Sequence, residues 1–306
     1  MGTTQPGDEP ADGPALGCLR AGPTAARMLV GARLRELRQN AGISLETAGA
    51  AIRASDSKIS RLERGRTGFS QRDVADLLTC YGVTDAGDRR VLLDLAEQAN
   101  VPGWWQSYAD VLPDWFEPYL GLEPAASLIR TYAVQFIPDL LQSEEYAKTA
   151  LWLSHLDDTA SQIARRVELR LRRQQILNRP APPRLWAVID ETALRRPIGS
   201  PDTMRAQLTH LIELAARPNI TVQLVPFSAG GHPAAGGSIT FLRFPEGVLP
   251  DVVYREQDVS AVYVEKPADI AHYWSVLNGL GLQAAEPDET VQILHEIRAE
   301  ISAPEG

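Results

Sequence analysis

Residues 44–65, SLETAGAAIRASDSKISRLERG, constrain the fold of this chain more than any other stretch. They predict two short helices separated by a break of about three residues. Ser44 and Ser55 are residue types that cap helix N-termini, and Gly65 is the type that ends a helix. Two helices this short cannot be stable alone, so they must pack into a larger bundle.

The second of these short helices has one apolar side, which Ile59 and Leu62 form. Its other sides carry polar and basic residues: Ser57, Lys58, Arg61 and Arg64. Two apolar residues can anchor such a helix to a bundle while its basic side chains face outward.

The charge of the chain is unevenly distributed. The 306 residues carry a net charge of −9, but residues 27–72 hold ten Arg or Lys and four acids, which is +6. The remainder is acidic, at −2 for residues 1–26 and −13 for residues 73–306. A basic module on an acidic body indicates that only the module meets a polyanion. A solvated surface is the alternative interpretation of such a charge run.

The overall composition is that of an ordinary globular protein of one to three domains, at 44% apolar and 23% charged residues. No run approaches the roughly 18 apolar residues of a membrane span, so no membrane association is expected. Residues 1–26 are rich in Gly, Pro and Ala, lack an apolar block of signal-peptide length, and are predicted to be a disordered tail. Cys18 and Cys80 fit neither a disulfide framework nor a zinc motif, which favours a reduced, cytoplasmic location.

Helical periodicity and cap residues predict an all-α bundle over residues 27–100. Its first helix spans about 26–40 and its last about 86–100, and the short pair and a fourth helix after Ser70 lie between them. The aromatic-rich segment 101–124 then forms a junction, which we expect to be packed rather than flexible.

The pattern changes after this junction to an α+β domain over residues 125–285. Short β-branched or aromatic runs bounded by Pro or Gly predict six strands, at 128–136, 185–190, 220–227, 238–244, 251–256 and 261–266. Helices are predicted at 143–153, 158–178, 201–217 and 268–282. Residues 286–306 form a C-terminal helix and tail. The predicted fold class is therefore multi-domain, with an all-α helix-turn-helix bundle followed by an α+β domain.

A helix, a short turn and a second helix that is polar outward form the helix-turn-helix motif. Its second helix fits the major groove of double-stranded DNA, and its first residues contact base edges. Ser57, Lys58 and Arg61 are therefore the candidate base-reading residues. The candidate phosphate contacts lie at the margins of the motif: Arg53, Arg64 and Arg66.

The segment 29–81 resembles the Cro/phage-repressor (XRE-like) helix-turn-helix family, whose fold is lambda-repressor-like. The resemblance rests on LRELRQNAGISLETAGAAI, SDSKISRLERGRTGFS and DVADLL, and ISRLERG at 59–65 is its most specific part. It implies an ion pair between Arg38 and Glu63. Leu45 stands where the family often has a Gln that contacts DNA.

The remainder of the chain resembles a C-terminal domain of uncertain function found in antitoxin-like regulators of actinobacteria. The matching stretches are IRTYAVQFIPDLLQSEEYAKTAL (129–151), VPFSAGGHPAAGGSITFLRFPE (225–246) and DVVYREQ (251–257). A small acidic partner protein is often encoded beside members of that family, so the resemblance implies a possible partner protein or effector for this domain.

Catalytic alternatives are weaker. None of the five histidines has metal-ligand spacing, so neither a metal nor a cofactor is expected; they are His155, His210, His232, His272 and His295. The Gly-rich segment 230–237 lacks the Lys and Ser/Thr of a phosphate loop and predicts a mobile hairpin loop, although His232 could line a ligand pocket. Asp190 and Glu191 end a predicted strand, where a turn is expected and catalytic acids also occur.

These patterns together predict a sequence-specific DNA-binding transcriptional regulator that is not an enzyme. A single reading helix covers few base pairs, so a homodimer on a two-fold site is expected. The acidic domain would sense an effector or partner protein, or dimerise. The alternative is an antitoxin-like interaction module that binds a small partner protein and uses DNA binding for autoregulation.

Overall fold

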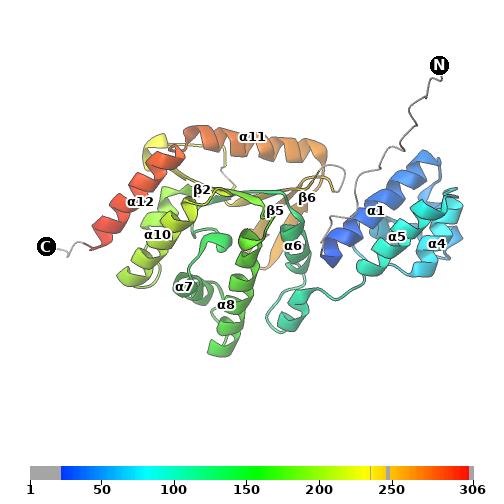
Figure 1. Ribbon diagram of the computed structural model, residues 1–306, viewed down its shortest axis with the longest axis horizontal. Helices are drawn as coiled ribbons and strands as arrows, with labels where there is room; N and C mark the ends of the chain where they lie inside the picture. Colours follow the sequence, from blue (N-terminus) through cyan, green and yellow to red (C-terminus); the bar gives the residue numbers. More distant parts are fainter. Residues whose placement is uncertain (1–21, 235, 246–248, 303–306) are drawn as a thin grey trace, which may run out of the picture.

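The computed structural model describes residues 22–234, 236–245 and 249–302, which form a helical bundle joined to a body built on a mixed β-sheet (Figure 1). This arrangement confirms the predicted fold class. The first helix begins at Pro23, a residue type favoured in the first helical turn. The last residues of the predicted tail are therefore helical, and residues 1–21 lie outside the described part.

The bundle contains the five predicted helices. Their bounds are α1 Pro23–Asn40, α2 Leu45–Ala51, α3 Asp56–Glu63, α4 Gln71–Cys80 and α5 Ala86–Gln98. The residues that the helical period places inward form the core, and those that are at most 2% exposed include Leu34, Ile59, Leu62, Val74 and Leu78. Because each helix is short, burial of these side chains rather than helix propensity holds the bundle together.

Arg38 of α1 and Glu63 of α3 form a bidentate ion pair inside the bundle. Arg38 Nε donates to Glu63 Oε1 at 2.6 Å and Nη2 donates to Oε2 at 3.0 Å, while Nη1 donates to the carbonyl of Ile43 at 2.8 Å. The two side chains are only 12% and 5% exposed. The hydrogen bond to Glu63 raises the pKa of Arg38, and burial together with the Glu63 charge raises the pKa of the neighbouring Tyr81 hydroxyl. Arg38 therefore keeps its charge beside a neutral tyrosine.

The aromatic junction is packed against the body. It contains η2 Trp104–Tyr108, α6 Glu117–Leu122 and η3 Glu123–Ala125. Trp105, Tyr108 and Leu120 are buried in one cluster with Leu169 of the body. The Tyr119 ring lies 4.3 Å from the Tyr254 ring, measured between centroids. This segment thus belongs structurally to the body and is not a flexible linker.

The bundle contacts this junction through the beginning of α1. Thr24 lies against Gly121 of α6 so closely that any side chain at position 121 would collide with it. Arg27 adds a hydrogen bond from Nε to the carbonyl of Ala99 at 2.7 Å, which ties α1 to the end of α5. One helix therefore connects the core of the bundle to the body.

The body contains one six-stranded sheet in the order β3-β2-β1-β4-β5-β6. Its strands are β1 Leu128–Ala133, β2 Arg184–Asp190, β3 Ile220–Val225, β4 Ile239–Arg243, β5 Val252–Gln257 and β6 Ser260–Val264. The pairs β1–β2 and β2–β3 are parallel, and the pairs β1–β4, β4–β5 and β5–β6 are antiparallel. All six predicted strands are present, with ends that differ by up to three residues.

Helices cover both faces of the sheet. They are α7 Glu144–Ser154, α8 Ala160–Gln174, α9 Glu191–Arg195, α10 Pro201–Ala215, α11 Pro267–Gln283 and α12 Pro287–Ser302, with 3₁₀ turns at Asp139–Leu141, Gln175–Asn178 and Phe227–Ala229. The helix α11 runs along one face, and α7, α8 and α10 lie on the other (Figure 1). The predicted separate C-terminal helix, α12, packs on α10 and β3, and its Thr290 hydroxyl accepts from the backbone of Leu224 at 3.1 Å. The body therefore extends beyond residue 285.

Two local predictions are wrong. The described residues of the Gly-rich segment, 230–234 and 236–237, do not belong to a hairpin loop, because β3 and β4 are not neighbours. The strands β1 and β2 lie between them, so the connection from β3 to β4 crosses over both. Asp190 and Glu191 do not form a simple turn. The Asp190 side chain accepts from the backbone of Thr192 and caps the short helix α9, whose first residue is Glu191.

The buried Arg173 of the body has two carboxylate partners. Arg173 of α8 is 5% exposed, donates to both Glu123 oxygens at 2.9 and 3.0 Å and reaches Asp139 at 2.9 Å. Burial alone would raise the pKa of Asp139, but Arg170 and Arg173 outweigh it and lower that pKa. This cluster fixes the junction, through Glu123, to α8.

We expect Glu63→Ala to lower the free energy of unfolding of the bundle by about 3 kcal/mol, because it leaves the Arg38 charge largely buried without a partner. Urea unfolding followed by circular dichroism measures the change. The matched control is Glu36→Ala, which removes an exposed ion pair with Arg33 and should cost less than about 1 kcal/mol. Equal losses in the two variants would contradict a structural role for the Arg38–Glu63 pair.

Candidate nucleic-acid interface

The helices α2 and α3 form the motif that the sequence predicts, each with a serine cap. Ser44 Oγ accepts from the backbone of Thr47 at 3.1 Å, and Ser55 Oγ accepts from the backbone of Lys58 at 3.2 Å. Each cap satisfies a backbone donor that the first helical turn would otherwise leave unpaired. The short helices therefore begin at defined residues.

The turn between α2 and α3 holds Arg53 in a left-handed conformation, with φ of 54°. The backbone of Arg53 donates to Ala50, and that of Ala54 donates to Gly49, which is the Schellman hydrogen-bond pattern. The helices α1, α3 and α4 end in the same conformation at Gly42, Gly65 and Gly82. An arginine at this position costs about 1–2 kcal/mol relative to a favoured conformation. Its presence there suggests that the side chain serves a purpose other than stability.

The end of α3 lies close to α1, and glycines permit this approach. A Cβ atom at Gly31 of α1 would lie 2.5 Å from the carbonyl oxygen of Leu62. A Cβ atom at Gly65 would lie 2.8 Å from Met28 Cα, and Gly65 also has a φ of 65°. Larger residues at either position would displace α3. The orientation of the candidate reading helix is thus set by its contact with α1.

The three candidate base-reading residues differ in position and in freedom, since Ser57 and Lys58 lie in the first turn of α3 and Arg61 lies in its last turn. Ser57 and Arg61 are exposed, and one helical turn separates them. Lys58 is half-buried, and its Nζ donates to Asp73 Oδ2 of α4 at 2.8 Å. The sequence pattern did not predict this ion pair, because Asp73 lies 15 residues away in another helix. Asp73 thus engages one of the three N–H donors of Lys58 and holds the side chain toward α4.

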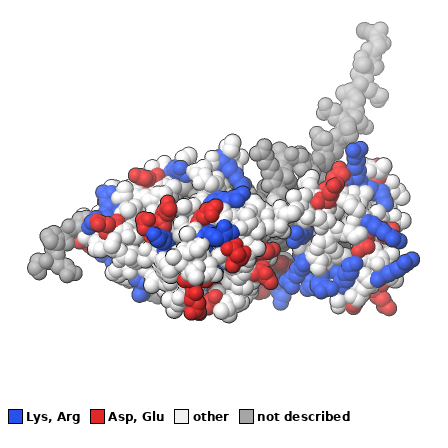
Figure 2. All heavy atoms as spheres, turned by 90° about the horizontal axis from the view of Figure 1, so that it is seen from below, with Lys and Arg blue, Asp and Glu red and all other residues white. Residues whose placement is uncertain are grey.

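The three candidate phosphate contacts are all exposed. Arg53 lies in the turn before α3, and Arg64 and Arg66 follow the end of α3. Arg64 Nε donates to the carbonyl of Ser60 at 3.0 Å, which directs part of its guanidinium back to the helix. Figure 2 shows Lys and Arg side chains projecting from the bundle, at the right of that view. The cations therefore lie on both sides of the reading helix.

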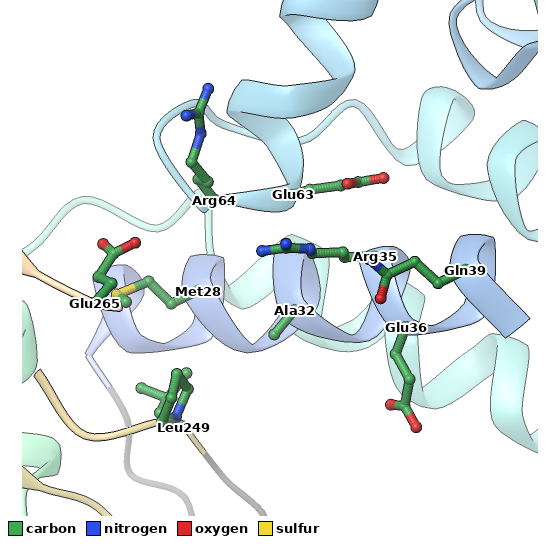
Figure 3. Close-up of a pocket in the computed structure, with 10 residues that line it drawn as sticks. Met28, Ala32, Arg35, Glu36, Gln39, Glu63, Arg64, Leu249 and Glu265 are labelled. Carbon is green, nitrogen blue, oxygen red and sulfur yellow. The ribbon is translucent and has the colours of Figure 1, made fainter. Parts of the chain in front are cut away.

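A cavity of about 180 Å³ lies between the bundle and the body, beside their direct contact at Thr24 and Gly121. Met28 and Arg35 of α1 and Arg64 line its bundle side, and Leu249 and Glu265 line its body side (Figure 3). Its lining thus brings an acid of the body together with a candidate phosphate contact. No spacing in the sequence indicates this site, because it exists only where two domains meet.

The structure also brings together residues from the weaker catalytic alternatives. Tyr132 of β1 hydrogen-bonds through its hydroxyl to His232 Nε2 at 2.9 Å and to Asp190 Oδ2 at 3.2 Å. His232 belongs to the segment that crosses over β1 and β2, so this contact holds the segment on the sheet. Across the described residues, no group of three or more His, Cys, Asp or Glu side chains could hold a metal ion. No helix in the described part is long and apolar enough to cross a membrane.

Comparisons with known proteins agree with the two parts of the fold. Residues 29–92 match the family model of a helix-turn-helix domain, and residues 116–296 match that of the domain of unknown function DUF5753. The HTH-type transcriptional regulator DdrOP3 of Deinococcus deserti is 35% identical over 101 residues, which are 33% of this chain and 75% of that protein.

A solved structure, that of the clp gene regulator ClgR from C. glutamicum, is 29% identical and covers 25% of this chain and 94% of its own. Its TM-score of 0.20 is too low for a structural conclusion. The family matches confirm both resemblances drawn from the sequence. The chain belongs to the DUF5753 family and carries the helix-turn-helix domain of an HTH-type regulator in front of that domain.

Proposed function

We propose that this protein is a cytoplasmic, sequence-specific DNA-binding transcriptional regulator that binds a two-fold site as a homodimer. The observation that carries the proposal is the presentation of α3, whose apolar side is buried while Arg61 and the flanking arginines are exposed. Such a helix can enter the major groove, where Arg61 suits the O6 and N7 acceptors of guanine. The function is binding rather than catalysis.

We infer that the body senses an effector or a partner protein, or dimerises, and that its state alters DNA binding. The packed contact between α1 and α6 supports this, because a flexible linker could not transmit such a change. A ligand that favours one domain arrangement must shift DNA affinity, and DNA must shift ligand affinity by the same factor. An antitoxin-like role would use the same body to bind a small partner protein.

Binding of the full chain to duplex DNA should depend steeply on salt. Several phosphate contacts from Arg53, Arg64, Arg66 and their neighbours release counterions, so the slope of log K against log salt should be steeper than about −3. Fluorescence anisotropy with a labelled duplex at several salt concentrations measures this slope. A response that is flat in salt would remove the DNA-binding proposal.

Arg61→Ala should reduce discrimination at one base step by about 1–3 kcal/mol. Arg66→Ala should weaken all sequences alike and reduce the salt slope by about one. Selection of binding sites from a random duplex pool, done with each variant, measures both effects. Wild-type sites should be two-fold symmetric. Recovery of the same motif by wild type and Arg61→Ala would show that Arg61 does not read bases.

Arg53→Gly should stabilise the bundle by about 1 kcal/mol, because glycine adopts the left-handed conformation without steric cost. The same variant should bind DNA more weakly, because it loses a cation beside the reading helix. Melting temperature and DNA affinity are measured on one preparation. The matched control is Arg53→Lys, which keeps both the charge and the strained backbone and should change neither quantity much. Unchanged DNA affinity in Arg53→Gly would leave the strain without a functional reason.

A further inference from the structure

Arg130 of β1 is a buried cation without a carboxylate partner. Its side chain is 1% exposed. Its guanidinium lies between two indole rings, 3.9 Å from the Trp186 centroid and 4.7 Å from the Trp274 centroid. Within the described ranges, no carboxylate oxygen lies within ion-pair distance of it, and its Nε has no hydrogen-bond partner. Other buried charges in this body are paired, as Arg173 is with Glu123.

The polar contacts of Arg130 are all neutral. Nη1 donates to Asn278 Oδ1 at 2.6 Å, and Nη2 donates to the carbonyl of Leu277 at 3.0 Å. Arg243, whose charge also acts on Arg130, is positive and already paired with Asp251 at 2.9 Å. Burial and the Arg243 charge lower the pKa of Arg130 to about 10, so it still carries its proton at neutral pH. An unpaired buried charge is costly, and its usual compensation is a nearby anion.

A surface cavity of about 390 Å³ lies next to this cation. Trp186, Thr221, Asn278 and Gly281 are among the residues that line it. The cation lies close to Gly281, a residue of the cavity lining, because a Cβ atom at Gly281 would lie 3.8 Å from Arg130 Nη2. The size suits a small ligand. Trp186 supplies an aromatic surface, and Thr221 supplies a hydroxyl.

Asn278 connects Arg130 to the cavity. Its Oδ1 accepts from the guanidinium, which leaves the amide Nδ2 as a donor on an exposed residue. A donor whose own carbonyl accepts from a cation is strengthened by polarisation. Glu286 also lines the cavity, but it is exposed and its charge is screened by water, whereas Arg130 acts through a low-dielectric interior.

From this arrangement we propose that the cavity beside Arg130 and Asn278 binds a small planar carboxylate. The aromatic or conjugated part of the ligand lies against Trp186, and its carboxylate accepts from Asn278 Nδ2 and supplies the negative charge that Arg130 lacks. The ligand binds and is released without any covalent step.

The position of α11 links this site to the bundle. The helix has 17 residues, so it spans about 26 Å. Its C-terminal part carries Asn278 and Gly281, and its N-terminus follows Glu265, which lines the cavity against α1. A ligand that shifts one end of a rigid helix also shifts the other, and α11 crosses the body toward the bundle in Figure 1. This link rests on the proposed function, whereas the binding site does not.

The binding test uses the full chain and two probes of the same shape, benzoate and the neutral benzamide. Nitrogen–proton spectra report the Trp186 indole, whose Nε1 donates to Gln223 at 2.7 Å. Benzoate should shift this resonance with a Kd of about 1 mM, and benzamide should bind about tenfold more weakly. Equal affinity for the two probes would overturn the proposal.

Asn278→Asp places a carboxylate against Arg130 and so imitates the ligand. This variant should raise the melting temperature and weaken benzoate binding at least about tenfold. The control Gln283→Glu adds the same charge at an exposed position at the end of the same helix and should leave benzoate binding within about twofold. If Asn278→Asp is more stable yet binds benzoate as the wild type does, Arg130 only anchors α11 and the proposal fails. Arg130→Met gives a second check, because it should bind benzoate and benzamide equally.

A separate arm tests the link to DNA. Saturating benzoate, compared with benzamide in matched sodium chloride, should change the affinity of the wild type for its duplex by about fivefold or more. The change should be absent in Asn278→Asp. Equal affinities would refute the link through α11. Because the binding arm contains no DNA, failure of the site and failure of the regulator proposal are distinguishable.

Discussion

The close packing of α1 against its neighbours is the constraint on which the rest of the structure depends. Gly31 lets α1 contact the end of α3, and Arg38 on the same helix fixes Glu63 of α3. At its other end Thr24 contacts Gly121 of α6, which packs into the body. A single 18-residue helix therefore orients α3 and attaches the body. Close backbone contacts are stiff, so the two parts move together or separate at this one helix.

Much of this fold follows from local patterns in the sequence. The caps Ser44 and Ser55 begin α2 and α3, and the apolar pair Ile59 and Leu62 is buried as the helical period requires. Alternating β-branched runs bounded by Pro or Gly likewise identify all six strands. These local signals are enough to locate the helices and strands, because each depends only on residues that are close together in the sequence.

The remaining features depend on residues that are distant in the sequence. The strand order, in which β1 lies between β2 and β4, decides that segment 230–237 crosses the sheet, and no local pattern encodes that order. The ion pair of Lys58 with Asp73 joins two helices. The outward position of Lys58 in α3 predicts a free side chain, whereas the structure shows that Asp73 of α4 holds it. In the sequence, nothing distinguishes Arg130 from other charged residues in strands. Its burial is seen only in the folded chain, where β1 pairs with β2 and Arg130 lies opposite Trp186.

Arg53 and Arg130 share a property that separates them from the other arginines of the chain. Each is held at a cost. Arg53 has a left-handed backbone. Arg130 is buried without a carboxylate partner among the described residues, and its two indole rings and two hydrogen bonds offset only part of that cost. The same fold places glycine at three equivalent helix ends and pairs the buried Arg173 with acids. A glycine at position 53 and an acid beside Arg130 would therefore be more stable. Sites where local rules are broken without compensation inside the chain are expected where a ligand supplies the compensation. Under the function and the anion site that we propose, that ligand is a DNA phosphate for Arg53 and a small anion for Arg130, and the two positions would mark the two ends of one regulatory path.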